Sequence, residues 1–209
     1  MLAIACLSQK GGVGKSTLAR LIARTYAQGT WQVKIADFNV KQKTSVDWAA
    51  LRMSQNVRPE IPAEPFTDVS KALRGDNDLV VFDGRPESDP QSLRLAQDAT
   101  VVVVPTGVSG DDLAPQVRFA HELRSRGIDN RKILFVLNKT PDSEAAVKDA
   151  RNYIEQAGYA VAKTHLPMKV AYINAHNIGR CIAETEYPSL NDRSMALAKE
   201  IIAKVEELQ

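Results

Sequence analysis

The sequence has little cysteine, few aromatic residues and no long hydrophobic run. Its 209 residues include only two cysteines, Cys6 and Cys181, and this wide separation gives neither a disulfide framework nor a metal-binding spacing. No stretch approaches the ~20 apolar residues that span a bilayer, and the apolar N-terminal run is too short for a signal peptide. The 27 basic and 25 acidic residues leave a formal net charge of +2 without a long basic tract. We therefore expect a cytoplasmic protein.

The amino-acid composition predicts one compact α/β domain covering residues 1–209. Hydrophobic residues make up 44% and charged residues 25% of the chain, which is enough for a sizeable core. Apolar runs at 3–7, 33–36, 78–82, 100–105 and 132–137 predict buried strands. Helical patterns at 17–26, 45–53, 111–126 and 189–208 separate or follow them, with a short strand at 159–161 and a loop at 166–168. This alternation predicts right-handed crossovers and a mostly parallel sheet, with ligand at the carboxyl ends of its strands.

The segment from Gln9 to Thr17 is the most informative part of the chain, because it places a glycine-rich loop between an apolar strand and a helix. Glycines leave the backbone N–H groups free to converge on phosphate oxygens, and the helix N-terminus adds partial positive charge. Lys15 would reach the β and γ phosphates, and the Ser16 hydroxyl would ligate Mg²⁺. The expected nucleotide contacts in this loop are Gly11, Gly12, Val13, Gly14, Lys15, Ser16 and Thr17.

An extra lysine, Lys10, precedes these glycines, and Gln9 stands where the common pattern has glycine. The form K-G-G-x-G-K-[ST] resembles the deviant Walker A motif of the ParA/MinD family of partition and positioning ATPases. The resemblance implies a P-loop NTPase fold with helices on both faces of the sheet, and ATP and Mg²⁺ as cofactors. It also implies a homodimer around ATP in which Lys10 reaches the phosphates of the other subunit. The alternative for Lys10 is an ordinary solvated loop lysine.

Two acids follow at strand ends. Asp37 matches the first acid of the family's D-x-D motif, and Asp83, followed by Gly84, matches the end of a Walker B strand. The resemblance implies Ser16, Asp37 and Asp83 as the metal set, and Gly84 near the γ-phosphate as a mobile contact. Asn39 stands where the family has the acid that activates the attacking water, and an amide cannot take up that proton at neutral pH. Asn39 could still orient water for slow hydrolysis, or it could be only a turn residue.

Asn138 ends the apolar run at 132–137 and resembles the family's adenine-contacting asparagine; a simple hydrogen-bonding cap is the alternative. We expect Lys10, Lys15, Asp37 and Asn39 to carry catalysis. The first strand begins so near Met1 that we expect no N-terminal helix-turn-helix extension of the kind longer ParA-type proteins have. The absence of a C-x-x-C pair argues against the metal-delivery branch of the superfamily.

Partners are less well specified by the sequence. The resemblance implies binding of nonspecific DNA, hence nucleoid association, and a ParB-like or other adaptor protein. A solvated, charge-balanced face is the alternative to a DNA-binding patch. The candidate basic residues are Arg118, Arg124, Arg126, Arg131, Lys132, Lys163, Lys169 and Arg180. The C-terminal helix ends Glu206-Glu207, which disfavours anionic lipid, so we expect it to pack on the core and no membrane partner.

The function that fits best is an ATP-dependent partition ATPase that positions a plasmid, a mobile element or a protein assembly. Asn39 leaves open an ATP-sensing dimerisation switch with negligible hydrolysis. A third reading is a small-molecule ATP-dependent ligase of the same fold, similar to dethiobiotin synthetase.

Overall fold

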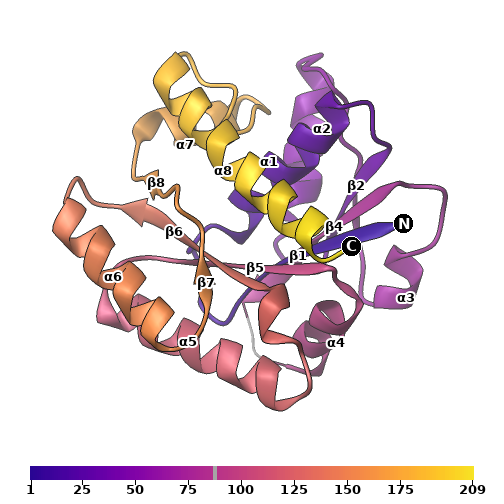
Figure 1. Cartoon of the computed structure of the whole chain (residues 1–209). Helices are drawn as coiled ribbons and strands as arrows, with labels where there is room; N and C mark the ends of the chain where they lie inside the picture. Colours follow the sequence, from indigo (N-terminus) through magenta and orange to yellow (C-terminus); the bar gives the residue numbers. More distant parts are fainter. Residues whose placement is uncertain (87–88) are drawn as a thin grey trace.

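Parallel β-strands form a central sheet that helices cover on both faces (Figure 1). The computed structural model describes residues 1–86 and 89–209. The strands are β1 (Leu2–Ser8), β2 (Val33–Asp37), β3 (Ala63–Pro65), β4 (Leu79–Pro86), β5 (Val101–Thr106), β6 (Ile133–Thr140), β7 (Ala160–Val161) and β8 (Leu166–Pro167). Their order is β3-β2-β4-β1-β5-β6-β7, with β8 paired to β6, and these pairings are parallel. The predicted α/β fold with a mostly parallel sheet is confirmed.

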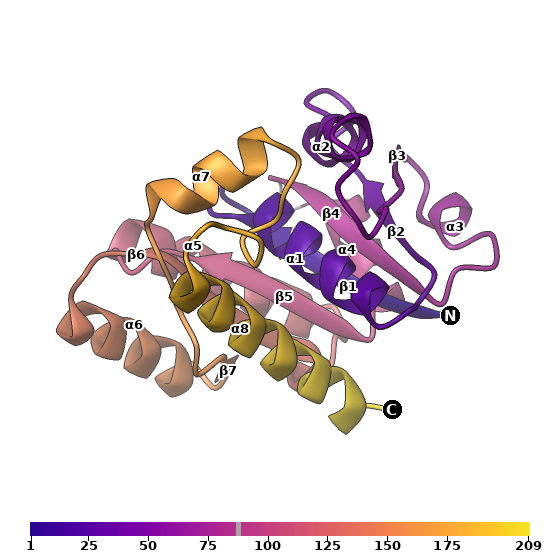
Figure 2. The ribbon, with the colours of Figure 1, turned by 90° about the horizontal axis from the view of Figure 1, so that it is seen from above.

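The helices form two layers, one on each face of this sheet (Figure 2). One layer holds α1 (Lys15–Gln28), α2 (Thr44–Ser54), α7 (Val170–Asn177) and α8 (Pro188–Glu207). The other holds α3 (Val69–Ala72), α4 (Pro90–Asp98), α5 (Gly110–Ser125) and α6 (Glu144–Gln156), and a 3₁₀ turn at Asn130–Lys132 precedes β6. Both faces of the central strands are therefore buried, which explains why these strands are apolar without interruption.

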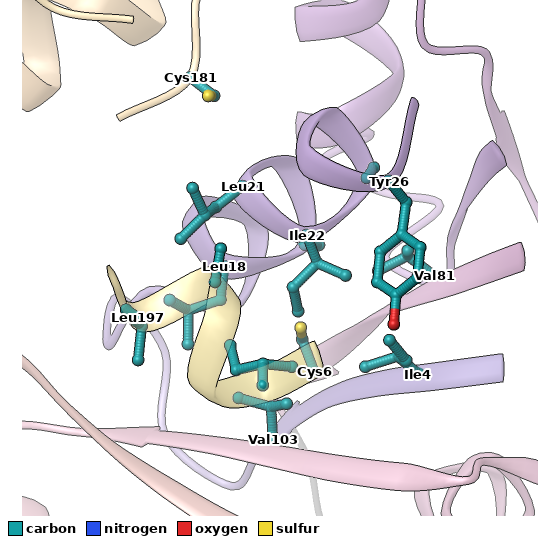
Figure 3. Packing of buried hydrophobic residues seen from close by; sticks show 14 of the residues in the cluster. Ile4, Cys6, Leu18, Leu21, Ile22, Tyr26, Val81, Val103, Cys181 and Leu197 are labelled. Atoms are coloured by element: carbon teal, nitrogen blue, oxygen red, sulfur yellow. The ribbon is translucent and has the colours of Figure 1, made fainter. Parts of the chain in front are cut away.

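Alternate residues of strand β1 pack against the two helical layers. Its residues Ile4 and Cys6 pack under α1 and α8, whereas Ala5 and Leu7 pack toward α4 and α5, as expected when successive side chains point to opposite faces of a sheet. Figure 3 shows the first of these two cores, where Leu18, Leu21 and Ile22 of α1 gather over β1. Both cysteines are free, buried thiols.

The C-terminal helix α8 packs on the core, as expected. Leu197, Ile201 and Val205 are buried in the same cluster as α1. A charge-rich face lies outside, so the apolar stripe is used within the domain. Within the described part of the chain, no helix combines the length and the apolarity that crossing a membrane requires.

Several short elements differ from the sequence expectation. The predicted loop at 166–168 is wrong in part, because Leu166 and Pro167 form β8 beside Asn138 and Thr140 of β6. The strand predicted to end at Asp83 continues to Pro86, and its pairing with β1 shifts register between Asp83 and Pro86. The elements β3, α3, α4, α6 and α7 were not predicted. Two- and three-residue strands acquire their identity from a partner strand, and local periodicity carries no sign of it.

Candidate functional site

The glycine-rich loop lies between the end of β1 at Ser8 and the start of α1 at Lys15, as predicted. Gly12 and Gly14 have φ values of 75° and 111°, in the region that favours glycine. A Cβ atom at Gly14 would also overlap the side-chain amide of Asn138. The loop conformation therefore requires glycine at both positions.

A cavity of about 320 Å³ opens above this loop at the carboxyl edge of the sheet. It gathers residues from four separate segments, which is the arrangement that binds ligand in parallel α/β sheets. Its lining residues are Gly11, Gly12, Gly14, Lys15, Ser16, Thr17, Asn39, Gln42, Thr44, Asp83, Gly84, Pro86 and Lys139. The side chain of Val13 is buried instead, so this residue can offer a ligand only its backbone.

Lys15 lies at the floor of the site and is 7% exposed. Its ammonium donates to the carbonyl oxygen of Lys10 at 3.1 Å. Burial lowers the pKa of Lys15, and the charge of Asp83 opposes this shift. A buried ammonium with one carbonyl partner is well placed to exchange that partner for a phosphate oxygen.

Asp37 and Asp83 lie side by side, because β2 and β4 pair these two residues directly. Asp37 accepts from the backbone N–H groups of Asn39 and Ser45 at 2.9 Å each. Asp83 accepts from the Ser45 hydroxyl at 2.6 Å. Burial raises the pKa of Asp83 to about 6, with Asp37 adding to the rise and hydrogen bonds from Ser45 and Ser16 opposing it.

These oxygen donors fit Mg²⁺, which prefers carboxylate, hydroxyl and water ligands. Burial and the nearby negative charge of Asp37 raise the pKa of Asp83, whereas the Arg20 guanidinium lowers it, so a bound cation would stabilise the charged form of this carboxylate. No third His, Cys, Asp or Glu joins them in the parts of the chain that the structure describes. A magnesium ion here would depend on Ser16, Asp83 and water, with Asp37 behind them because its oxygens hold backbone amides.

Gly84 brings β4 close to β1. A Cβ atom there would meet Leu7 and come within 3.1 Å of the Cys6 carbonyl oxygen. The glycine thus lets β4 pack tightly while its backbone lines the cavity. Its predicted movement with the γ-phosphate stays a prediction.

Lys10 extends away from the cavity floor, and its side chain is 42% exposed. The ammonium pairs with Asp112 at 2.5 Å and donates to the carbonyl oxygen of Asp111 at 3.3 Å. One turn along α5, Gln116 donates to the Ser8 hydroxyl at 2.8 Å and accepts from the Gln9 N–H at 3.3 Å. Helix α5 therefore holds the segment in which Lys10 lies. Neither Asp112 nor Gln116 was predicted as a site residue, because only the tertiary fold brings them close to the end of β1.

Asn39 is part of a tight turn at the rim of the cavity. Its amide donates to the Gln42 side-chain oxygen at 2.7 Å, and the backbone N–H of Lys43 donates to its carbonyl at 2.8 Å. Asn39 and Gln42 both line the cavity. Asn39 is therefore a turn residue that also lines the cavity, and its water-orienting role stays a prediction.

Asn138 and the next residue, Lys139, reach the loop from the end of β6. The Asn138 amide donates to the Val13 carbonyl at 2.7 Å, and the Lys139 ammonium donates to the Gly12 carbonyl at 2.6 Å. The adenine contact expected for Asn138 stays a prediction, whereas its contact with the loop is observed. Lys139 was missed, although its place beside Asn138 at a strand end was a usable signal.

The basic residues considered for DNA binding lie on several elements, and some have local partners. Arg131 forms a two-point ion pair with Asp129 at 2.7 Å and 3.0 Å. Lys169 pairs with Asp142 at 3.1 Å, and Lys132 donates to the Ala99 carbonyl at 3.0 Å. These contacts favour the charge-balanced alternative for part of the set.

A parallel sheet, a glycine-rich loop before α1 and buried carboxylates on neighbouring strands define a P-loop nucleotide-binding protein. The comparisons with known proteins narrow this class. The family described as the CobQ/CobB/MinD/ParA nucleotide binding domain matches residues 4–180. The chain belongs to this family, as the motif predicted.

Similar solved structures share this fold at low sequence identity. The cell division protein MinD of Aquifex aeolicus has 15% identity and a TM-score of 0.74, covering 97% of each chain. Apo McdA of Cyanothece has 16% identity and a TM-score of 0.76, covering 96% of this chain and 99% of that one. A putative plasmid partition protein of Borrelia burgdorferi bound to AMPPNP has 12% identity and a TM-score of 0.75, covering 97% and 99%. No curated protein matches the chain in sequence.

Proposed function

We propose that this protein is an ATPase that binds Mg·ATP, dimerises around it and positions a cargo with the help of an adaptor protein. The nucleotide would lie in the cavity above the glycine-rich loop, where Lys15 would hold its phosphates. Mg²⁺ would supply charge neutralisation between the β and γ phosphates. Ser16 and Asp83 would hold the ion, and Asp37 would keep the chain after β2 in place through its two backbone contacts.

The observation that carries the dimer is the placement of Lys10. Among the described residues, Lys15 lines the cavity and Lys10 does not. Lys10 lies at its margin with a half-exposed side chain, whose ammonium contacts the Asp112 carboxylate and the Asp111 carbonyl oxygen. An exposed ion pair of this kind is worth ~0.2–1 kcal/mol, so a second subunit's triphosphate can compete for the lysine.

Hydrolysis would use Asn39 to orient the attacking water. Phosphoryl transfer depends mainly on positioning and charge stabilisation, so an amide at this place is compatible with slow turnover. Gln42 holds the Asn39 amide and lines the same cavity. The pair would act together on the water. Because neither amide takes up a proton, the same pair also favours the second candidate, an ATP-sensing switch with negligible turnover.

The proposals about a cargo, DNA and an adaptor protein are based on similar proteins. One similar structure is a MinC:MinD complex of Aquifex aeolicus, another is a MinD of Pyrococcus horikoshii with Mg-ADP, and a third is a plasmid partition protein of Borrelia burgdorferi. We infer that this protein likewise acts together with separate partner molecules. The ATP dimer would associate with nonspecific DNA, and a ParB-like or other adaptor would bring the cargo and stimulate turnover.

The test combines light scattering with steady-state ATP hydrolysis in the presence and absence of nonspecific DNA. We expect a dimer with Mg·ATP and slow turnover that DNA alters. Lys15→Ala should abolish nucleotide binding, whereas Lys10→Ala should retain some binding without dimerising. A Lys10→Ala protein that still dimerises with ATP would show that the proposed dimer is wrong. A stable dimer without turnover would select the switch, and turnover by a monomer would reopen the ligase.

A further inference from the structure

Two consecutive residues at the end of β6 hold the glycine-rich loop by its carbonyl oxygens. Asn138 donates to Val13 and Lys139 donates to Gly12, at 2.7 Å and 2.6 Å. The partners are more than a hundred residues apart in sequence, and they meet because β5 lies next to β1 in the sheet and β6 lies next to β5. Both oxygens belong to adjacent peptide units of the loop that would cradle phosphates.

The backbone around Lys139 has an unusual conformation that supports its contact with the glycine-rich loop. Lys139 has a φ of 54°, a left-handed conformation that non-glycine residues rarely adopt, and the residues on either side of it are buried strand residues. The Asn138 amide occupies the space that the missing Cβ of Gly14 leaves open. Strained residues persist where the surrounding structure fixes them, and they cluster at binding sites.

Peptide geometry links these contacts to phosphate binding. A trans peptide unit is planar, with its C=O and the following N–H pointing in opposite directions. Holding the carbonyl of Gly12 therefore fixes the N–H of Val13, and holding the carbonyl of Val13 fixes the N–H of Gly14. Backbone N–H groups at these places are the ones that converge on phosphate oxygens in such loops.

We propose that Asn138 and Lys139 are positioning residues that orient the N–H groups of Val13 and Gly14 toward the phosphates before nucleotide arrives. This proposal rests on the proposed function, because it assumes that the loop binds a nucleoside di- or triphosphate. It gives Asn138 a role in phosphate binding that differs from an adenine contact, and it assigns a role to Lys139. The Lys139 contact is the easier of the two to test, because its side chain is exposed and its charged donor can be replaced without disturbing the core, whereas the Asn138 contact is buried.

The first experiment measures binding of Mg-ADP and of magnesium pyrophosphate by calorimetry. The variants are Lys139→Met, which removes the ammonium, and Lys139→Arg, which keeps a charged donor. Lys148→Met is the matched control, because Lys148 is an exposed lysine of α6 that does not line the cavity. We expect Lys139→Met to weaken both ligands by roughly tenfold, Lys139→Arg to stay within about threefold of wild type, and the control to be unchanged.

Pyrophosphate lacks a base, so it separates positioning from base recognition. Weakening of ADP alone would mean that Lys139 contacts the nucleobase, and the proposal would be wrong. Equal affinities in wild type and Lys139→Met would also overturn it. If the wild-type protein bound neither ligand, the proposed function would fail instead, and the second experiment would still test the positioning.

That second experiment follows hydrogen exchange in the peptide covering residues 9–17 of the nucleotide-free protein. If Lys139 fixes the loop in advance, Lys139→Met should speed exchange there several-fold, and Lys139→Arg should restore protection. Unchanged exchange together with weaker pyrophosphate binding would make Lys139 a direct phosphate ligand, which contradicts the positioning role. Circular dichroism of each variant shows whether the fold is retained.

Discussion

At the scale of single residues, the proposed ATP hydrolysis depends on the chemistry of Asn39. Asn39 lines the cavity two residues after Asp37, whose carboxylate holds the Asn39 backbone. The Asn39 side chain is engaged with Gln42. It can orient water through its oxygen, but it cannot remove a proton.

Asn39→Asp should therefore raise steady-state ATP turnover. General-base contributions run to ~10²–10⁴, but positioning dominates phosphoryl transfer, so we expect an increase of roughly tenfold. The measurement is phosphate release at saturating Mg·ATP. Asn152→Asp, which adds the same charge on exposed α6, should leave the rate unchanged. An unaltered rate in Asn39→Asp would reduce Asn39 to a turn residue.

The ion pair between Lys10 and Asp112 should oppose dimerisation, because the pair must open before Lys10 reaches a second subunit. Asp112→Asn removes that competition and should tighten the ATP dimer by up to about fivefold for each pair that opens, the upper limit for an ion pair of this kind. Sedimentation velocity in Mg·ATP measures the dissociation constant. Asp111→Asn is the control, since Asp111 offers Lys10 only its backbone carbonyl. A weaker dimer in Asp112→Asn would instead place Asp112 within the interface.

At the scale of helices and strands, the long apolar runs were predictable and the short elements were not. A central strand such as β5 is apolar because both faces are buried, which any window of the sequence shows. The strand β8 exists only because β6 offers it a partner. The same distinction applies to the site: Lys15 and Asp83 follow from local motifs, whereas the contact of Lys139 with Gly12 depends on strand order.

Helix α7 packs on α1 through a histidine that must stay neutral. His176 lies 3.3 Å from the Arg20 guanidinium, and burial together with that charge lowers the pKa of His176 to about 3. Unfolded histidine titrates near 6.5, so between about pH 6.5 and 3 the unfolded chain binds a proton that the folded chain excludes. The contribution of His176 to the free energy of unfolding should therefore fall by about 1.4 kcal/mol per pH unit between pH 6.5 and 3, whereas Asp83, with a folded pKa of about 6, contributes in the opposite direction below pH 6.

Urea unfolding near pH 7, 6 and 5 measures this dependence. His176→Gln should lack this part of the loss, because an amide oxygen can accept from Arg20 without titrating. The other titrating groups are the same in both proteins, so the difference between wild type and His176→Gln in the pH dependence of the free energy of unfolding gives the contribution of His176. Equal pH dependence in the two proteins would show that His176 is protonated in the folded state.

Helix α8 should contribute to stability through its buried stripe. Ile201 is fully buried against α1, whereas its neighbour Ile202 is only partly buried. Ile201→Ala should reduce the free energy of unfolding by about 2–4 kcal/mol, and Ile202→Ala by about 1 kcal/mol. Urea unfolding of both variants provides the comparison. Similar losses at the two positions would contradict the observed packing of this helix.

At the scale of the whole molecule, dimerisation and DNA binding should be linked by charge. The monomer carries a formal net charge of +2, and several of its basic side chains already have acidic partners. One subunit therefore neutralises few phosphates. Two subunits held together by ATP would present twice the number of basic contacts to one DNA segment.

This doubling should appear in the salt dependence of DNA binding. The slope of log K against log[salt] is about −0.9 per phosphate neutralised, so the slope with ATP should be about twice that without nucleotide. Fluorescence anisotropy with a random-sequence duplex measures both slopes. Lys10→Ala should keep the smaller slope even with ATP bound, because it removes the dimer and leaves the basic residues unchanged. If Lys10→Ala and wild type had the same slope in ATP, DNA binding would be a property of the monomer, and ATP could not control the release of cargo through dimerisation.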